Sequence, residues 1–242
     1  FDVDWDEDGT AHHERFVARI EPPTGALFPA QTAACGVSVE VQYRAMQLAA
    51  AHGVRTMAHA DGGGVMYVDQ AADLGTASRL VREGLDRLGV CNRLNLLLVH
   101  TAVWDDALAV ARAAADDAGV TLALPPHDHA LGLEWALQEG DEAHVTVAPV
   151  GSYAEAAATA NAETSGLAAT IVTEDAAAAD GFIADYAGTG AFWNATTRLL
   201  DGFKLLAAPE TGINVDHVPG PRGPVTFRDL YLRQFVVTPA GS

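Results

Sequence analysis

The chain alternates between short runs of aliphatic residues and longer stretches in which apolar residues recur every three or four positions. The short runs are typical of buried β-strands, and the wider spacing is typical of amphipathic helices. Glycine and proline clusters separate many of these stretches, as expected for turns. On this pattern we predict strands at 14–22 and 54–60, within 61–69, at 94–100, 120–124 and 144–150, ending in 170–175, and within 190–198.

Helical patterns fall between these strands. We predict helices at 39–53, 73–89, 105–119, 153–166 and 175–188, and a short helix followed by a last strand in the tail 223–237. Regular alternation of strand and helix is typical of βα units. The sequence therefore predicts an α/β fold with a largely parallel sheet, whose chemistry we expect to lie at one sheet edge.

Composition narrows the class of protein. The chain has 242 residues, of which 49% are hydrophobic and 19% are charged, as in ordinary globular proteins. It has no run of eighteen apolar residues, so we expect no membrane span. Its acidic opening, with Phe1 in first place, does not have the pattern of a signal peptide and leaves room for residues upstream.

Charge and cysteine content bear on partners and location. The formal charge is −18 and Lys204 is the only lysine, which argues against nucleic acid as a partner. The two cysteines, Cys35 and Cys91, do not have the pattern of a secreted disulfide framework. We expect both to be reduced thiols in a cytoplasmic protein.

The stretch GVCNRLNLLLVH places Cys91 and Asn92 directly before an aliphatic strand. A thiolate there could attack acyl groups if neighbouring dipoles lowered its pKa, and Asn92 could support a developing oxyanion. The alternative is that Cys91 is a small buried apolar residue.

Other motifs are weaker. His12–His13 and the pair His127 and His129 have no third ligand at suitable spacing, so we predict no metal site. The run Gly62–Gly64 does not have the spacing of a phosphate-binding loop. No G-x-S-x-G motif or paired acids stand out, and Phe192 and Trp193 fit a core better than a ligand box.

Six stretches in order resemble γ-glutamyl-phosphate reductase (glutamate-5-semialdehyde dehydrogenase), a branch of the aldehyde dehydrogenase superfamily. The resemblance covers about residues 54–237 and is most specific around Cys91. The matching stretches are HADGGGVMYVDQAADL (59–74), VCNRLNLLLVH (90–100), SGLAATIVTEDAAAA (165–179), WNATTRLLDG (193–202), ETGIN (210–214) and RGP (222–224).

The resemblance implies NADPH-dependent reduction of an acyl phosphate to an aldehyde in proline biosynthesis. Cys91 would attack the acyl carbon and form a thioester, with Asn92 supporting the oxyanion. Arg198 could pair with a carboxylate or phosphate, or be a solvated loop charge. Glu139 would lie near the ribose of the cofactor. The substrate would contact the loop that carries Asn194, Thr196, Thr197 and Arg198.

The chain also departs from the family pattern. Residues 1–58 would hold only a remnant of the dinucleotide-binding domain, which is mostly absent, and 59–242 would form the catalytic domain. Several family polar residues are replaced, as in Asn95-Leu96, SGLAA (165–169), the run from Gly202 to Leu206, and Gly64-Val65.

These features leave two hypotheses open. The first is an enzyme acting on a small acyl substrate, as a homo-oligomer or with a partner chain that supplies the dinucleotide-binding domain. The second is a catalytically degenerate paralogue that acts as a scaffold or regulatory subunit. The retained Cys91 motif favours the first, and the replaced polar residues favour the second.

Overall fold

The structure is a computed structural model. The predicted strand 14–22, most of the predicted helix 39–53, Cys35 and the tail beyond 226 lie outside the residues it describes. The described residues are 26–27, 47–48, 51–52, 55–56, 62–88, 90–214 and 223–226.

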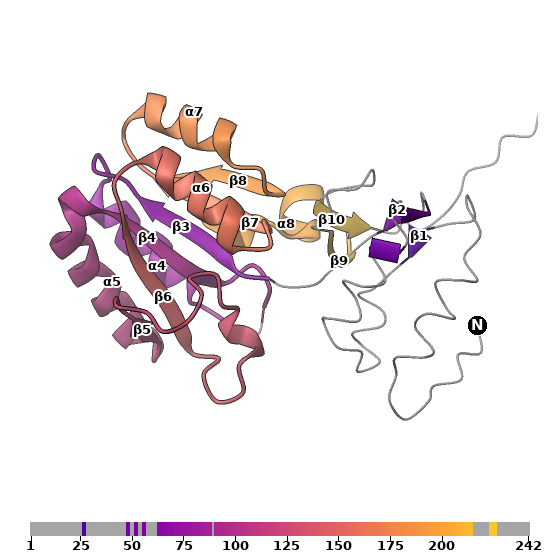
Figure 1. The fold of residues 1–242 in the computed structure, drawn as a ribbon, viewed down its shortest axis with the longest axis horizontal. Helices are drawn as coiled ribbons and strands as arrows, with labels where there is room; N and C mark the ends of the chain where they lie inside the picture. Colours follow the sequence, from indigo (N-terminus) through magenta and orange to yellow (C-terminus); the bar gives the residue numbers. More distant parts are fainter. Residues whose placement is uncertain are drawn as a thin grey trace, which may run out of the picture.

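A six-stranded sheet, in which every pair of neighbouring strands is parallel, forms the centre of the described chain (Figure 1). Its strand order is β5-β6-β4-β3-β7-β8, so the predicted α/β class and parallel sheet are confirmed. The strands are β3 (Gly64–Val68), β4 (Leu94–His100), β5 (Thr121–Ala123), β6 (His144–Val150), β7 (Ala168–Val172) and β8 (Gly190–Trp193).

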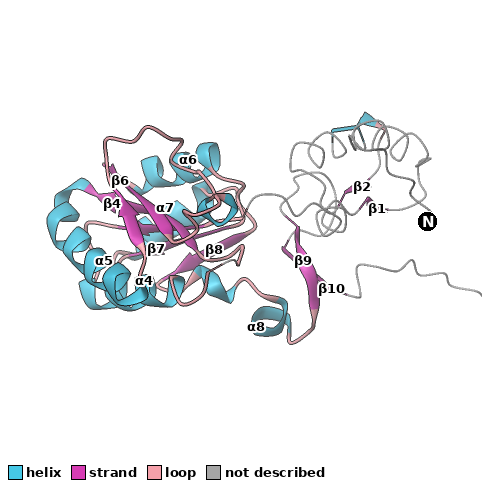
Figure 2. Cartoon of the chain, turned by 90° about the horizontal axis from the view of Figure 1, so that it is seen from below, coloured by secondary structure: helices cyan, strands magenta, loops and turns pink. Residues whose placement is uncertain are grey.

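Two helices cover each face of the sheet (Figure 2). Three of them begin at a side-chain cap, in which Asp73, Ser152 or Asp175 accepts a backbone N–H of the first turn. One face carries α4 (Leu74–Gly84) and α5 (Trp104–Ala118), and the other carries α6 (Tyr153–Glu163) and α7 (Ala176–Asp185).

The two cores differ in their neighbours, because successive residues of each strand point to opposite faces. Along β3, Met66 and Val68 pack with α4 and α5, while Val65 and Tyr67 pack with α6 and α7. All five residues of β3 are buried, and so are all seven of β4. Strands covered on both faces are expected to read as continuous apolar runs, as these do.

Several predicted boundaries shift. The predicted helix 73–89 ends at Gly84, so the residues that follow belong to the loop that leads to Cys91. The sequence did not predict α8 (Gly202–Leu206) or β9 (Glu210–Asn214). Strand β9 pairs in antiparallel fashion with β10 (Gly223–Thr226), the described start of the predicted tail. Short pieces β1 (Ala26–Leu27) and β2 (Arg55–Thr56) pair in parallel.

None of the helices among the described residues combines the length and the apolar character needed to cross a membrane.

Candidate active site

Cys91 lies at the amino edge of the sheet, three residues before β4 begins at Leu94. Its side chain is partly exposed and packs against a small apolar cluster. The residues of that cluster come from the start of β7, from β8, from the segment after η3 (Thr197–Leu199) and from β9: Leu167, Ala168, Phe192, Leu200 and Ile213.

The glycine run before β3 fits closely around this edge. A Cβ at Gly62 would lie 2.7 Å from Cα of Cys91, and one at Gly64 would lie 2.5 Å from Oγ1 of Thr197. At Gly63, where φ is +95°, a Cβ would lie 2.6 Å from a carboxylate oxygen of Glu134. Side chains at these positions would therefore displace neighbouring groups. The run lets three segments approach the backbone and does not cradle a phosphate.

Asn92 connects the Cys91 turn to η3, the 3₁₀ turn Thr197–Leu199. Its side chain is 5% exposed, and its amide group donates to the carbonyl of Leu200 at 2.9 Å. Its side-chain oxygen accepts from the guanidinium of Arg198, and its backbone carbonyl accepts from Oγ1 of Thr197 at 2.9 Å. The oxyanion role of Asn92 stays a prediction. Its observed contacts hold the turn in place.

The surroundings of Cys91 favour its protonated form. Burial raises the pKa of its thiol to about 11, and the carboxylates of Glu210 and Glu134 add to the rise. The charge of Arg198 opposes it more weakly. The lowered pKa that was the condition for a reactive thiolate at rest is therefore not met here, because loss of solvent and nearby negative charge outweigh one cation.

Glu210, the first residue of β9, is the carboxylate with the largest effect on Cys91. One of its oxygens accepts the backbone N–H of Gly202 at 2.7 Å. Burial raises the pKa of Glu210 itself, although that hydrogen bond opposes the rise. A carboxylate with a raised pKa is a better proton acceptor than an ordinary one. The residue pattern did not single out Glu134, and Glu210 entered only as the first residue of the matching stretch ETGIN (210–214).

The four residues predicted to contact substrate bond two different sets of partners. Thr196 caps η3 by accepting the N–H of Arg198, and Thr197 and Arg198 lie against Asn92 near the amino edge. Asn194 directly follows the carboxyl end of β8. There its amide bonds the backbone of Thr173.

That carboxyl edge has its own polar network, in which the buried carboxylate of Asp69 is central. Asp69 accepts from Oη of Tyr67 at 2.8 Å and from Oγ1 of Thr173 at 2.7 Å. Its oxygens thus connect β3 to β7, and Asn194 extends the network to β8. In this structure Asn194 therefore belongs to the hydrogen-bond network at the carboxyl ends of β3, β7 and β8, and its bonds to Thr173 do not involve the Cys91 turn.

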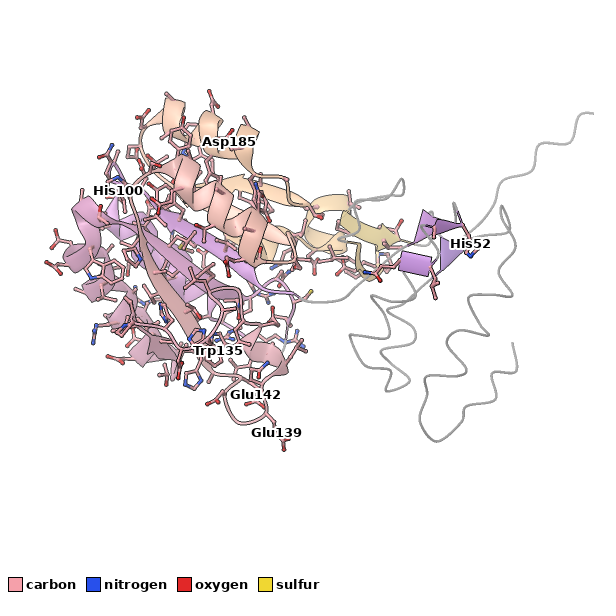
Figure 3. All side chains as sticks on the ribbon, viewed as in Figure 1. His52, His100, Trp135, Glu139, Glu142 and Asp185 are labelled. Atoms are coloured by element: carbon pink, nitrogen blue, oxygen red, sulfur yellow. The ribbon has the colours of Figure 1, made fainter. Side chains whose placement is uncertain are left out.

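Glu139 lies on an exposed loop between η2 (Trp135–Leu137) and β6 (Figure 3). In that view its side chain points away from the sheet, as does that of Glu142. With the run Gly62–Gly64 packed against protein atoms, the described residues do not form a dinucleotide cradle. The residues present therefore do not fit a complete cofactor site.

Three histidines lie near Trp135: His127 and His129 precede it in the chain, and His144 is the first residue of β6. His129 and His144 are in ring contact with Trp135, at centroid separations of 5.0 and 4.9 Å, and His127 is in ring contact with His129 at 5.1 Å. Within the described ranges, no cluster of three or more His, Cys, Asp or Glu side chains has the arrangement of a metal site.

No family model matches the chain. It is 36% identical over 189 residues to γ-glutamyl phosphate reductase of Synechococcus sp. strain WH7803, an overlap of 75% of this chain and 43% of that relative. A second relative of that name, from Synechococcus elongatus, is 33% identical over 78% of this chain. The chain is a homologue of γ-glutamyl phosphate reductase. It spans less than half the length of these relatives.

Solved structures agree with this relationship. γ-Glutamyl phosphate reductase of Thermotoga maritima superposes with a TM-score of 0.68 at 25% identity, over 81% of this chain and 49% of that one. An acetylating aldehyde dehydrogenase of Geobacillus thermoglucosidasius superposes with a TM-score of 0.61 at 13% identity. The described sheet and its helices thus have the fold of an aldehyde dehydrogenase catalytic domain, as the resemblance to γ-glutamyl phosphate reductase implied.

Proposed function

We propose that the chain carries the acyl-transfer part of an NADPH-dependent reduction of an acyl phosphate, similar to γ-glutamyl phosphate, to an aldehyde. The observation that carries this proposal is the position of Cys91. It is partly exposed, lies at the amino edge of the sheet and has carboxylates within electrostatic range. The homology to γ-glutamyl phosphate reductase supports the substrate class and a role in proline biosynthesis.

In the acyl-transfer step, Sγ of Cys91 forms a bond to the acyl carbon, the bond from that carbon to the phosphate oxygen breaks, and phosphate leaves. The thiol is neutral at rest, so its proton must leave during the attack, and Glu210 is our proposed acceptor. An amide group has two N–H donors, and Leu200 accepts one from Asn92. The second could support the oxyanion, while Thr196 and Thr197 border the substrate.

NADPH, when bound, would supply hydride for the reduction. Because the described residues do not fit a dinucleotide site, we propose that a partner chain or a further region carries that site. Glu139, which lies on an exposed loop of this chain, would contact only a cofactor that the other chain or region holds. Assembly into a homo-oligomer and a cytoplasmic location are part of the same proposal.

A second function is supported by a specific observation. A thiol whose pKa is raised to about 11 and which packs against apolar residues also fits a small buried residue of a non-catalytic protein. In that case the chain is a scaffold or regulatory subunit that keeps the fold of γ-glutamyl phosphate reductase without its chemistry.

A pre-steady-state measurement of phosphate release distinguishes the two functions. With acetyl phosphate as the probe, we expect a burst of about one phosphate per chain, because the thioester accumulates when it cannot be reduced. The matched pair of variants is Cys91→Ser, which should lose the burst, and Cys35→Ser, which should keep it. Absence of a burst from the folded protein would support the scaffold.

A further inference from the structure

The loop that carries Cys91 is bonded at both ends by one side chain. The guanidinium of Arg198 donates from Nε to a carboxylate oxygen of Asp86 at 2.9 Å, and from a terminal nitrogen to the side-chain oxygen of Asn92. Asp86 follows the end of α4, and Asn92 follows Cys91 directly. Asp86 and Asn92, which flank the connection from α4 to the Cys91 turn, therefore meet on a single cation.

The guanidinium of Arg198 is largely buried where it bonds Asp86 and Asn92. The side chain of Arg198 is only 12% exposed, whereas that of Asp86 is 54% exposed. A planar guanidinium can bond two acceptors on different edges at once, which a lysine ammonium does with less geometric control. Both observed acceptors belong to the Cys91 loop, so the cation is already paired and its direction is fixed.

The backbone around Arg198 is held as well. Its own carbonyl accepts from Nζ of Lys204 at 3.0 Å, and its N–H donates to Oγ1 of Thr196 at 3.2 Å. Its neighbour Thr197 donates to the carbonyl of Asn92. The η3 turn is therefore a rigid support from which Arg198 reaches out to the Cys91 loop.

We infer that Arg198 is a positioning residue that closes the Cys91 loop through Asp86 and Asn92 and does not bind the substrate itself. The inference rests on the proposed function only in its consequence for catalysis, since the closed loop is a property of the resting protein. Closure fixes Asn92 and, through it, the placement of the thiol toward an acyl carbon.

Limited trypsin digestion tests the closed loop without any activity. Arg87 and Leu88 are exposed within the loop, so the bond between them is a reporter of loop opening. In Arg198→Gln we expect cleavage at that bond about 10-fold faster than in the unmodified protein, because two of the contacts that oppose local opening are lost. Asp86→Asn removes only the exposed contact and should give a smaller increase.

Arg82 offers the matched control. It lies on α4, four positions before Asp86, and its side chain bonds Asp117 at 3.3 Å and Ser78. Arg82→Gln should leave cleavage after Arg87 unchanged. Equal cleavage in the Arg198 and Arg82 variants, or no acceleration in either Arg198→Gln or Asp86→Asn, would overturn the inference.

The acetyl phosphate burst then separates positioning from substrate binding. For Arg198→Lys and Arg198→Gln we expect the burst rate constant at saturation to fall about 10-fold, since a small misplacement of the nucleophile slows the step. The half-saturating acetyl phosphate concentration should stay within about 2-fold of its original value. A large rise in that concentration with an unchanged rate constant would assign Arg198 to the substrate instead. If the unmodified protein gives no burst, the proposed function fails while the trypsin result still decides the loop closure.

Discussion

Cys91 is expected to react with iodoacetamide at pH 7 about 10-fold more slowly than an ordinary free cysteine. Its thiol has a pKa of about 11 against a usual value of 9.0, so the reactive thiolate is about 100-fold scarcer. A more basic thiolate is intrinsically more nucleophilic, which offsets about 10-fold of that difference. The rate should therefore keep rising with pH beyond 9, reach half its maximum near pH 11 and level off only above that, as quantified by mass spectrometry of the Cys91 peptide.

Two glutamate variants test the cause of this slow reaction. Glu210→Gln removes the carboxylate with the largest effect on the thiol, so it should lower the pKa of Cys91 and accelerate alkylation. Glu139→Gln removes an exposed carboxylate from the loop before β6 and should leave the rate unchanged. A rate profile that levels off at or below pH 9 in the unmodified protein would show that burial of the thiol is less than described.

The second large effect concerns stability. Phe182 is fully buried between two tyrosine rings, with centroid separations of 6.1 Å to both Tyr67 and Tyr186. Phe182→Ala is expected to lower the free energy of unfolding by about 3–5 kcal/mol, because it removes a large apolar side chain and leaves a cavity under α7. Urea denaturation followed by circular dichroism measures the change.

Phe203 provides the matched control for this substitution. It lies on α8 and is 66% exposed, so Phe203→Ala should change the free energy of unfolding by less than about 0.5 kcal/mol. If the two variants had equal stability, the packing of α7 against the sheet would be misassigned.

The sequence predicted the fold well where periodicity was strong. Strand β6 begins and ends where the pattern placed it, because an aliphatic run bounded by charged and glycine residues has few alternatives. The end of α4 was placed too late, since Leu85 and Leu88 continue the helical spacing although the helix ends at Gly84. The short elements α8 and β9 were missed because neither has the long aliphatic run or the regular apolar spacing of the elements that were predicted.

The sequence predicted the position of the Cys91 turn but not the groups that surround the thiol. The Cys91 motif identified the turn, but the sign of the thiol pKa depends on burial and on Glu210, which is distant in sequence. Likewise, Asn194 is near Thr197 in sequence, yet Asn194 bonds Thr173 after the end of β7, whereas Thr197 bonds Asn92 before the start of β4. Spacing along a loop does not reveal which edge of a parallel sheet each residue reaches.

Identifying the residue that carries a trapped acetyl group is the direct test of the proposal that Cys91 is the nucleophile. The protein is mixed with acetyl phosphate, quenched in acid, digested and analysed by mass spectrometry, with Lys204, the only lysine, as an internal monitor of non-specific acetylation. We expect one acetyl group on the Cys91 peptide, which hydroxylamine removes, and none in Cys91→Ser. Acetylation confined to Cys35 or Lys204, or no adduct on the folded protein, would contradict a catalytic Cys91.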